Sequence, residues 1–262
     1  MRPFKLLLLL AIAAAGGCSS IDNDPTKDWP VEKIYNEAHG ELADGNYGEA
    51  IKTYEKLLSR FPYGRYAEQT QLEIAYSYYK DEEPALAIAS VDRFLRLYPT
   101  HPNADYAYYL KGIINFSGDR DIVSSWFGAK DEDIADRDQK SLRDAYNAFR
   151  ELVERFPKSR YADDARQRVL FLFQIQARHE VRVAQFYYDR AAYVAAVNRC
   201  KFALENYPRT PAIEQALAVQ AKSYKMMGLD GLMTDSVRVL QLNFPESPYL
   251  AEIAALTPPK GS

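Results

Sequence analysis

Small and large apolar residues recur along this chain in a fixed order, which ends five times in an aromatic residue followed by proline. These pairs are Phe61-Pro62, Tyr98-Pro99, Phe156-Pro157, Tyr207-Pro208 and Phe244-Pro245. Twelve residues before each proline, and again twelve before that in three of the units, the chain carries mostly alanine: Ala50, Ala87, Ala145, Ala196 and Met233, then Ala38, Ala75 and Ala221. Mostly larger side chains follow four and seven positions later, on the same helical stripe. The pattern predicts pairs of antiparallel helices.

The residues between these stripes predict where the helices begin and end. Small side chains let two helices approach closely, and each proline ends a second helix because it lacks an N–H and clashes with the preceding turn. Gly45 and Gly228 lie seven residues beyond a first alanine, where the chain must turn into the second helix. Thr210-Pro211 and Ser247-Pro248 each place a hydroxyl before a proline, which predicts a capped helix start.

This spacing resembles the tetratricopeptide repeat (TPR), and the predicted fold is an all-α TPR solenoid of about five helix-turn-helix units. We place the solenoid at residues 31–257, with repeats at about 31–66, 67–102, 103–160, 161–211 and 212–257, and a tail at 258–262. In the third repeat Gly112 replaces the first alanine, and extra residues between Ser117 and Asp138 predict a protruding loop. In the fourth repeat the first helix is expected to run from about Ala162 to Asp189.

The N-terminus has the pattern of an export signal. A basic start is followed by an apolar run, Leu6 to Gly17, that is shorter than the roughly 20 residues a membrane span needs. Its small residues lead into Cys18, which resembles a bacterial lipobox, although Ala15 stands where leucine is usual. We therefore expect a signal peptide at 1–17, a lipid on Cys18 and a polar tether over 18–30. The alternative is an ordinary cleaved signal with a chance cysteine. Ser19 after the cysteine favours the outer membrane over the inner.

Composition argues against catalysis and against nucleic acid. The formal charge is −3 without a long basic block. The chain lacks a P-loop, a nucleophile elbow and a zinc-helix motif, and His39, His101 and His179 share no ligand spacing. Cys200 falls on an apolar stripe, as a small core residue does. We therefore expect no enzyme activity, no metal and no cofactor other than the covalent lipid on Cys18.

Aromatic residues form the one pattern in the sequence that suggests a binding surface. At 100° per residue, certain positions on the first helices of repeats one to three share a face turned away from the partner helix. They are Tyr35, His39, Tyr76, Tyr79, Tyr106, Tyr109 and Phe116. One interpretation is a groove that holds an extended peptide with apolar side chains. The other is that neighbouring repeats bury these rings against each other.

Several segments resemble the BamD family, the TPR lipoproteins of the outer-membrane β-barrel assembly machine. They are RFLRL at 93–97, PTHPN at 99–103, Trp126-Phe127-Gly128, FPKS at 156–159 and the stretch VAQFYYDRAAYVAAVNR at 183–199. The resemblance extends from about Val31 to Pro245. Family members usually have glycine where this chain has Ala191, a small departure at a turn.

The resemblance implies a non-catalytic scaffold on the periplasmic face of the outer membrane. Its C-terminal half would dock on the POTRA region of BamA, its N-terminal repeats would recognise C-terminal signals of unfolded outer-membrane proteins, and lipoproteins such as BamC and BamE would bind elsewhere. The family's BamA contact maps onto Asn198-Arg199, although Arg199 could instead form a local helix ion pair. The alternative class is an envelope TPR adaptor for peptidoglycan or division machinery.

Overall fold

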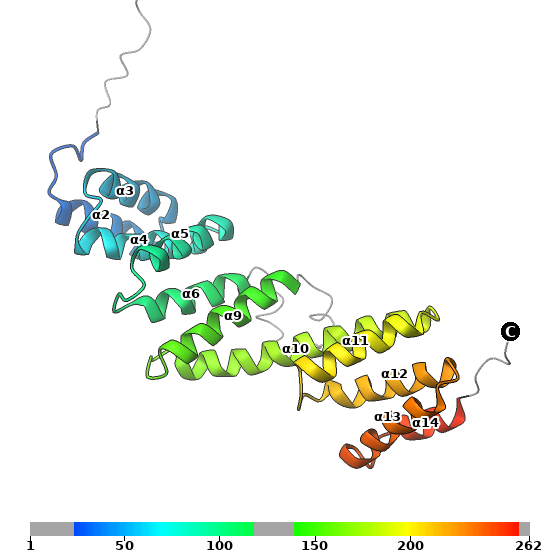
Figure 1. Ribbon diagram of the computed structural model, residues 1–262. Helices are drawn as coiled ribbons and strands as arrows, with labels where there is room; N and C mark the ends of the chain where they lie inside the picture. The colour runs from blue at the N-terminus through cyan, green and yellow to red at the C-terminus, as the bar shows by residue number, and fades with distance from the viewer. Residues whose placement is uncertain (1–23, 118–138, 257–262) are drawn as a thin grey trace, which may run out of the picture.

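The computed structural model describes residues 24–117 and 139–256, and every regular element in these residues is an α-helix (Figure 1). The helices are α2 (Val31–Ala43), α3 (Tyr47–Arg60), α4 (Arg65–Lys80), α5 (Pro84–Leu97), α6 (Ala104–Ser117), α9 (Gln139–Arg155), α10 (Ala162–Asp189), α11 (Tyr193–Asn206), α12 (Ala212–Met226), α13 (Asp230–Asn243) and α14 (Tyr249–Ala255). The predicted signal peptide, Cys18, the predicted loop with Trp126-Phe127-Gly128 and the predicted tail lie outside the described residues.

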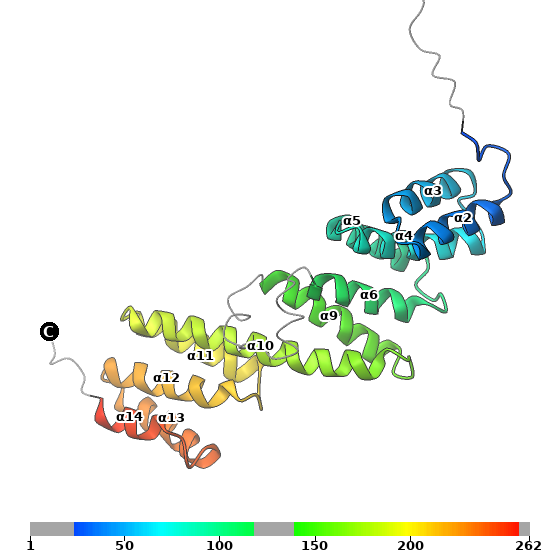
Figure 2. The ribbon, with the colours of Figure 1, turned by 180° about the vertical axis from the view of Figure 1, so that it is seen from behind.

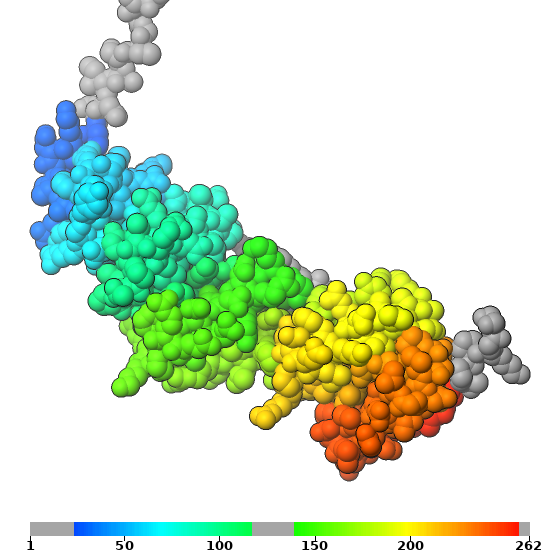
Figure 3. Space-filling view, in the orientation of Figure 1, coloured from blue at the N-terminus to red at the C-terminus, as the bar shows by residue number. Residues whose placement is uncertain are grey.

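Consecutive helices pack as hairpins, and the hairpins follow one another along an elongated stack. The pairs are α2 with α3, α4 with α5, α6 with α9, α10 with α11, and α12 with α13, while α14 closes the stack against α12. Figures 1 and 2 show α2 and α3 at one end of the molecule and α13 and α14 at the other. The space-filling view shows the hairpins in contact from end to end (Figure 3). The all-α repeat fold predicted from the sequence is confirmed.

Each second helix ends at the residue immediately before its aromatic-proline pair. The aromatic residue is the C-cap and its backbone N–H still donates to a carbonyl one turn back, as Phe61 does to Leu57 at 2.8 Å. The following proline cannot extend the helix. The long first helix of the fourth repeat is also confirmed, because α10 runs over 28 residues from Ala162 to Asp189.

Small residues lie at the helix crossings, as the spacing predicted. The seven alanines of the pattern, Ala38, Ala50, Ala75, Ala87, Ala145, Ala196 and Ala221, are all 0% exposed. Gly112 is needed for a stricter reason, because a Cβ added there would lie 2.4 Å from the ring of Phe149. Helices α6 and α9 therefore approach each other too closely for even a methyl group at this point.

The turn between the first and second helix of four repeats uses one residue in the left-handed region. Gly45 (φ 81°), Glu82 (φ 62°), Ala191 (φ 59°) and Gly228 (φ 71°) occupy equivalent positions in their repeats. Glycine adopts this conformation freely, whereas a residue with a Cβ is strained by roughly 1–2 kcal/mol. The departure from the family pattern at Ala191 therefore has a structural cost.

The predicted helix caps at Thr210 and Ser247 are wrong. Pro211 and Pro248 are themselves the N-cap residues in αR conformation, and neither α12 nor α14 has a side-chain cap. The Thr210 hydroxyl instead donates back to the carbonyl of Tyr207 at 3.0 Å, and the buried Ser247 hydroxyl has no partner. Each hydroxyl lies one residue too early to reach the first helical N–H groups.

Candidate functional site

The carboxylate of Glu73 on α4 joins the first two repeats through side chains of the predicted aromatic face. Tyr35 donates to its Oε1 at 2.5 Å, Tyr54 donates to its Oε2, and Gln69 donates to Oε1 at 3.0 Å. His39 Nδ1 lies 3.2 Å from Oε2, at the exposed edge of the cluster. Four partners from three helices thus fix the carboxylate and, with it, the angle between α2 and α4.

This cluster keeps its tyrosines protonated. Burial raises the pKa of Tyr35 and of Tyr54 above the usual value, and the hydrogen bond to the Glu73 carboxylate raises it further. Tyr35 is only 9% exposed and its ring lies 5.2 Å from that of Tyr66. In the first repeat, therefore, the predicted groove residue Tyr35 is packed between repeats.

A second carboxylate holds the rings of the third repeat. Tyr109 donates to Oδ2 of Asp164 at 2.9 Å, and its ring stacks on Tyr161 at 4.7 Å. Tyr106 contacts the same Tyr161 ring at 5.7 Å, and its pKa is raised mainly by burial. Both tyrosines thus bridge to the start of α10, in the next repeat.

The remaining members of the aromatic face differ in exposure. Phe116 is 1% exposed and belongs to the core between α6, α9 and α10, so it faces no open surface. Tyr76 and Tyr79 are half-buried, with ring centroids 6.4 Å apart, and the His39 side chain is 56% exposed. Most of these rings therefore pack between repeats, as the second sequence interpretation expects, and the peptide groove stays a prediction.

The predicted partner contact lies on a mixed apolar and basic surface of the fourth repeat. Asn198 and Arg199 are exposed on α11 and line a shallow pocket of about 300 Å³ together with Tyr187 of α10 and Phe202. A second hollow of about 530 Å³, which includes Val194, adjoins it and also contains Asn198. We call these two hollows the α11 patch.

Arg199 also makes the ion pair that the alternative interpretation required. Its Nη1 lies 3.0 Å from Oε2 of Glu180 on α10, and its side chain is 45% exposed against 13% for the glutamate. The pair leaves most of the guanidinium donors accessible, because an arginine carries five N–H groups. Phe202 lines the same pocket and is 42% exposed, and Val194 in the adjoining hollow is 64% exposed. Exposed apolar area around a cation is typical of protein interfaces.

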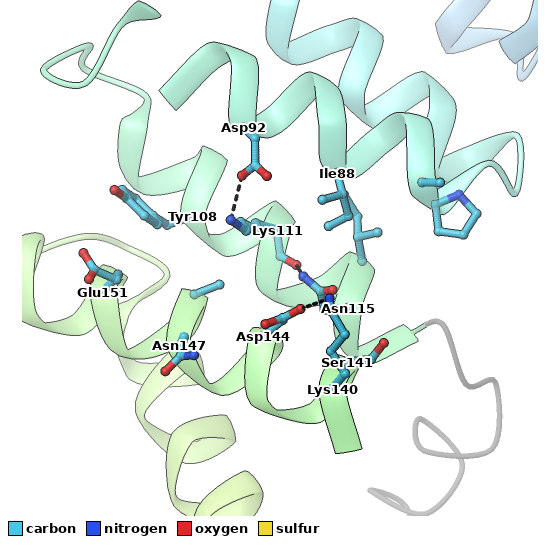
Figure 4. A pocket seen from close by; sticks show the side chains of 14 residues that line it. Ile88, Asp92, Tyr108, Lys111, Asn115, Lys140, Ser141, Asp144, Asn147 and Glu151 are labelled. Carbon is cyan, nitrogen blue, oxygen red and sulfur yellow. Dashed lines mark hydrogen bonds and ion pairs between the residues drawn. The ribbon is translucent and has the colours of Figure 1, made fainter. Parts of the chain in front are cut away.

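A larger cleft lies between α5, α6 and α9 (Figure 4). It measures about 820 Å³ and its floor includes Ile88 and Ile114. The charged side chains around it are paired with each other: Lys111 contacts Asp92 at 2.6 Å, and Lys140 contacts Asp144 at 2.7 Å (Figure 4). Glu151 also lines the cleft, and its carboxylate lies 3.9 Å from Arg155, which is not part of the lining.

Sequence reasoning missed Glu73, Asp164 and Tyr161, which organise the aromatic face. A charged residue two positions before a buried alanine, as Glu73 is before Ala75, was the available signal. Identifying its partners required knowing which helices meet, and a single-helix projection does not contain that information.

Cys200 is confirmed as a core residue. It is 0% exposed among Ala184, Ala196 and Val219, and burial raises the pKa of its thiol to about 12. A thiol that stays protonated at neutral pH is a poor nucleophile. Within residues 24–117 and 139–256 the structure shows no cluster of potential metal ligands and no helix long and apolar enough to cross a membrane.

Helical hairpins, two carboxylate-held aromatic groups and an exposed apolar patch together define a TPR-like protein. The sequence model of a family described as YfiO, outer membrane lipoprotein, matches residues 27–240. Outer membrane protein assembly factor BamD of Neisseria meningitidis serogroup B is 45% identical over 245 residues, which are 93% of this chain and 91% of the relative. The proteins of the same name from Vibrio cholerae and Xylella fastidiosa are 37% and 36% identical, over 90% and 95% of this chain and 96% and 85% of theirs.

The chain belongs to the BamD family of outer membrane lipoproteins. It is a non-enzymatic scaffold of the outer membrane, in agreement with the expectation from the sequence.

Proposed function

We propose that this chain holds two kinds of protein at the periplasmic face of the outer membrane, and that Cys18 carries the lipid that keeps it there. The fourth repeat docks on the POTRA region of BamA, and the first three repeats bind C-terminal signals of unfolded outer-membrane proteins. BamC and BamE are further expected partners. Several acyl chains, at about 0.8 kcal/mol per buried CH₂, are sufficient for a stable anchor.

The exposed α11 patch is the observation that carries the BamA part of this proposal. It combines Val194 and Phe202, two large apolar side chains open to solvent, with the half-exposed cation of Arg199. Docking would bury the apolar area and leave the guanidinium able to bond a carboxylate of the partner. The Glu180 pair then orients the guanidinium.

A charge exchange separates these two roles of Arg199. Arg199→Glu alone both repels Glu180 and presents the wrong charge to a partner. Arg199→Glu with Glu180→Arg restores the internal pair and still reverses the charge at position 199. We expect both variants to bind a purified BamA POTRA fragment at least about tenfold more weakly, since disrupted charge pairs at interfaces cost a few kcal/mol.

Titration calorimetry at two salt concentrations measures the effect, with far-ultraviolet circular dichroism to confirm folding. Arg238→Glu is the matched control, because Arg238 is exposed and pairs with Asp235 on α13. If the exchanged variant binds as well as the wild type, Arg199 acts only within the chain and the patch is not the BamA site.

For signal recognition, the adjacent half-buried rings of Tyr76 and Tyr79 in the second repeat are the part of the aromatic face we test. Removing both rings should weaken binding of a β-barrel C-terminal peptide by about tenfold or more, because an aromatic contact contributes on the order of 1–2 kcal/mol. Tyr63→Ala is the control, since that ring is 88% exposed outside this face. Normal peptide binding by Tyr76→Ala with Tyr79→Ala would place the recognition site elsewhere.

A further inference from the structure

The length of α10 creates a gap in the middle of the molecule. Helix α9 packs against the first half of α10 and α11 against the second half, so the start of α9 and the end of α11 face each other across the centre of α10 (Figure 1). A pocket of about 190 Å³ lies there, and its floor consists of Phe173 and Gln176. We call it the α10 pocket. None of the seven predicted groove residues lines it.

Gln176 brings an unsatisfied donor to this pocket. It is only 6% exposed, and its Nε2 has no hydrogen-bond partner, whereas its Oε1 accepts from Tyr207 at 3.4 Å. A buried amide N–H without an acceptor is costly, so such groups are rare unless a ligand or another molecule completes them.

The walls of the pocket add a cation and flat rings. Arg143 of α9 lies at the rim, is exposed and forms no ion pair with any residue in the described ranges. The Phe173 ring lies 6.2 Å from Tyr146 and 5.2 Å from Tyr207, and all three rings line the pocket together with Arg143. A pocket that combines an unpaired cation, a neutral N–H donor and apolar walls favours an anionic acceptor on an otherwise apolar segment.

We propose that the α10 pocket receives a carboxylate from an extended segment of a partner protein, held by the Arg143 guanidinium and by Nε2 of Gln176. At about 190 Å³ the pocket is smaller than the roughly 300–1,000 Å³ of small-molecule sites and matches a single side chain or a chain end. Asn147 lines both this pocket and the cleft of Figure 4, so the rest of the segment can lie across α9 into that cleft.

Three defined peptides test the chemistry and its source. The first is a capped ten-residue peptide of glycine and serine with a central Phe-Glu, the second carries Phe-Gln instead, and the third ends in Phe with a free carboxylate. They are titrated into the full lipidated chain in detergent, and the side-chain amide resonance of Gln176 is followed by nuclear magnetic resonance. We expect the first or the third peptide to shift this resonance, according to whether the carboxylate belongs to a side chain or to a chain end, and the Phe-Gln peptide to leave it unchanged.

Two substitutions in the pocket, Gln176→Met and Arg143→Met, should each weaken binding of the carboxylate peptide at least about tenfold. The matched controls are Gln174→Met, an exposed glutamine on the same helix, and Arg150→Met, two turns along α9 and outside the pocket. Removing an unsatisfied buried amide should also raise the thermal midpoint of the peptide-free Gln176→Met chain by about 2–4 °C.

Three results would overturn the proposal. They are equal binding of the Phe-Gln and Phe-Glu peptides, no shift of the Gln176 amide with any peptide at millimolar concentration, and equal losses in the control variants. A Gln176→Met chain that melts at a lower temperature and binds the peptide normally would assign the carboxamide to the core, with the same consequence. The substitutions at Gln176 and Arg143 leave the α11 patch and Tyr76 unchanged. The tests of BamA binding and of signal binding can therefore fail or succeed independently of this one.

Discussion

The first three repeats pack their helices with different side chains from those that the last two repeats use. The four aromatic side chains of the described residues that are less than 2% exposed, Tyr54, Phe94, Phe116 and Phe149, all lie in the first three repeats. The cores of the last two are rich in alanine, and eight large apolar side chains from α10 onward are exposed: Leu170, Phe186, Val194, Phe202, Leu229, Leu232, Val239 and Leu242. In the first three repeats only Tyr63, Leu86 and Leu97 are exposed large apolar side chains among the described residues, so the C-terminal half presents more of them to solvent.

We propose that this difference reflects a division of binding tasks between the halves. Hydrogen bonds to Glu73 and Asp164 hold rings of the first three repeats in place, and on this proposal they preorganise an aromatic surface for a flexible peptide. Exposed apolar side chains on the last two repeats gain stability only when a folded partner covers them. The two surfaces therefore suit different partners, one unfolded and one folded.

The largest expected contrast is between two phenylalanines. Phe149→Ala should cost about 3–5 kcal/mol of unfolding free energy, because its ring is fully buried against Gly112 and Tyr109. Phe202→Ala should cost less than about 1 kcal/mol, since that side chain is 42% exposed, but should weaken POTRA binding about tenfold. Urea unfolding and calorimetry measure the two effects. Equal destabilisation with unchanged binding would mean that Phe202 is core.

Alkaline pH should affect the N-terminal half first. Tyr35 and Tyr54 have raised pKa values, so above about pH 10 the unfolded chain loses protons that the folded chain retains, and stability falls as pH rises. Each group adds a slope of up to ~1.4 kcal/mol per pH unit. Tyrosinate absorbance should therefore appear together with loss of helix near α2 to α4.

Glu73→Gln sharpens this prediction. It should lower stability at neutral pH by about 1.5–3 kcal/mol through loss of charge-assisted hydrogen bonds, and should flatten the alkaline slope. Glu154→Gln, which removes an exposed charge from α9, is the control. A pH profile unchanged by Glu73→Gln would show that the carboxylate does not hold the two tyrosines.

The smallest expected effect concerns the turn before α11. Ala191→Gly should stabilise the chain by about 0.5–1 kcal/mol, because relief of the positive φ exceeds the entropy that glycine adds to the unfolded state. Gly45→Ala, at the equivalent turn, should destabilise by a similar amount. Thermal unfolding of both variants tests the pair, and a loss of stability in Ala191→Gly would contradict the strain.

Local patterns predicted the helices well and their cross-repeat partners poorly. Helix ends at each aromatic-proline pair and the long α10 depend on residues close in sequence, so the spacing was sufficient. Phe116, Tyr35 and Tyr109 were all predicted to face a groove, yet contacts with other helices bury the first in the core and bond the others to carboxylates. The hydroxyls of Thr210 and Ser247 failed as caps because the helix starts one residue later than proline position alone suggested.

The central claim is that the two halves bind two different partners at separate sites. The most direct test measures the affinity of a β-barrel C-terminal peptide for the lipidated chain alone and for the chain saturated with a BamA POTRA fragment. The account predicts affinities equal within about twofold and a ternary complex in size-exclusion chromatography with light scattering. Loss of peptide binding in proportion to POTRA occupancy would show that both partners use one surface, and would contradict the division of the molecule argued from its cores.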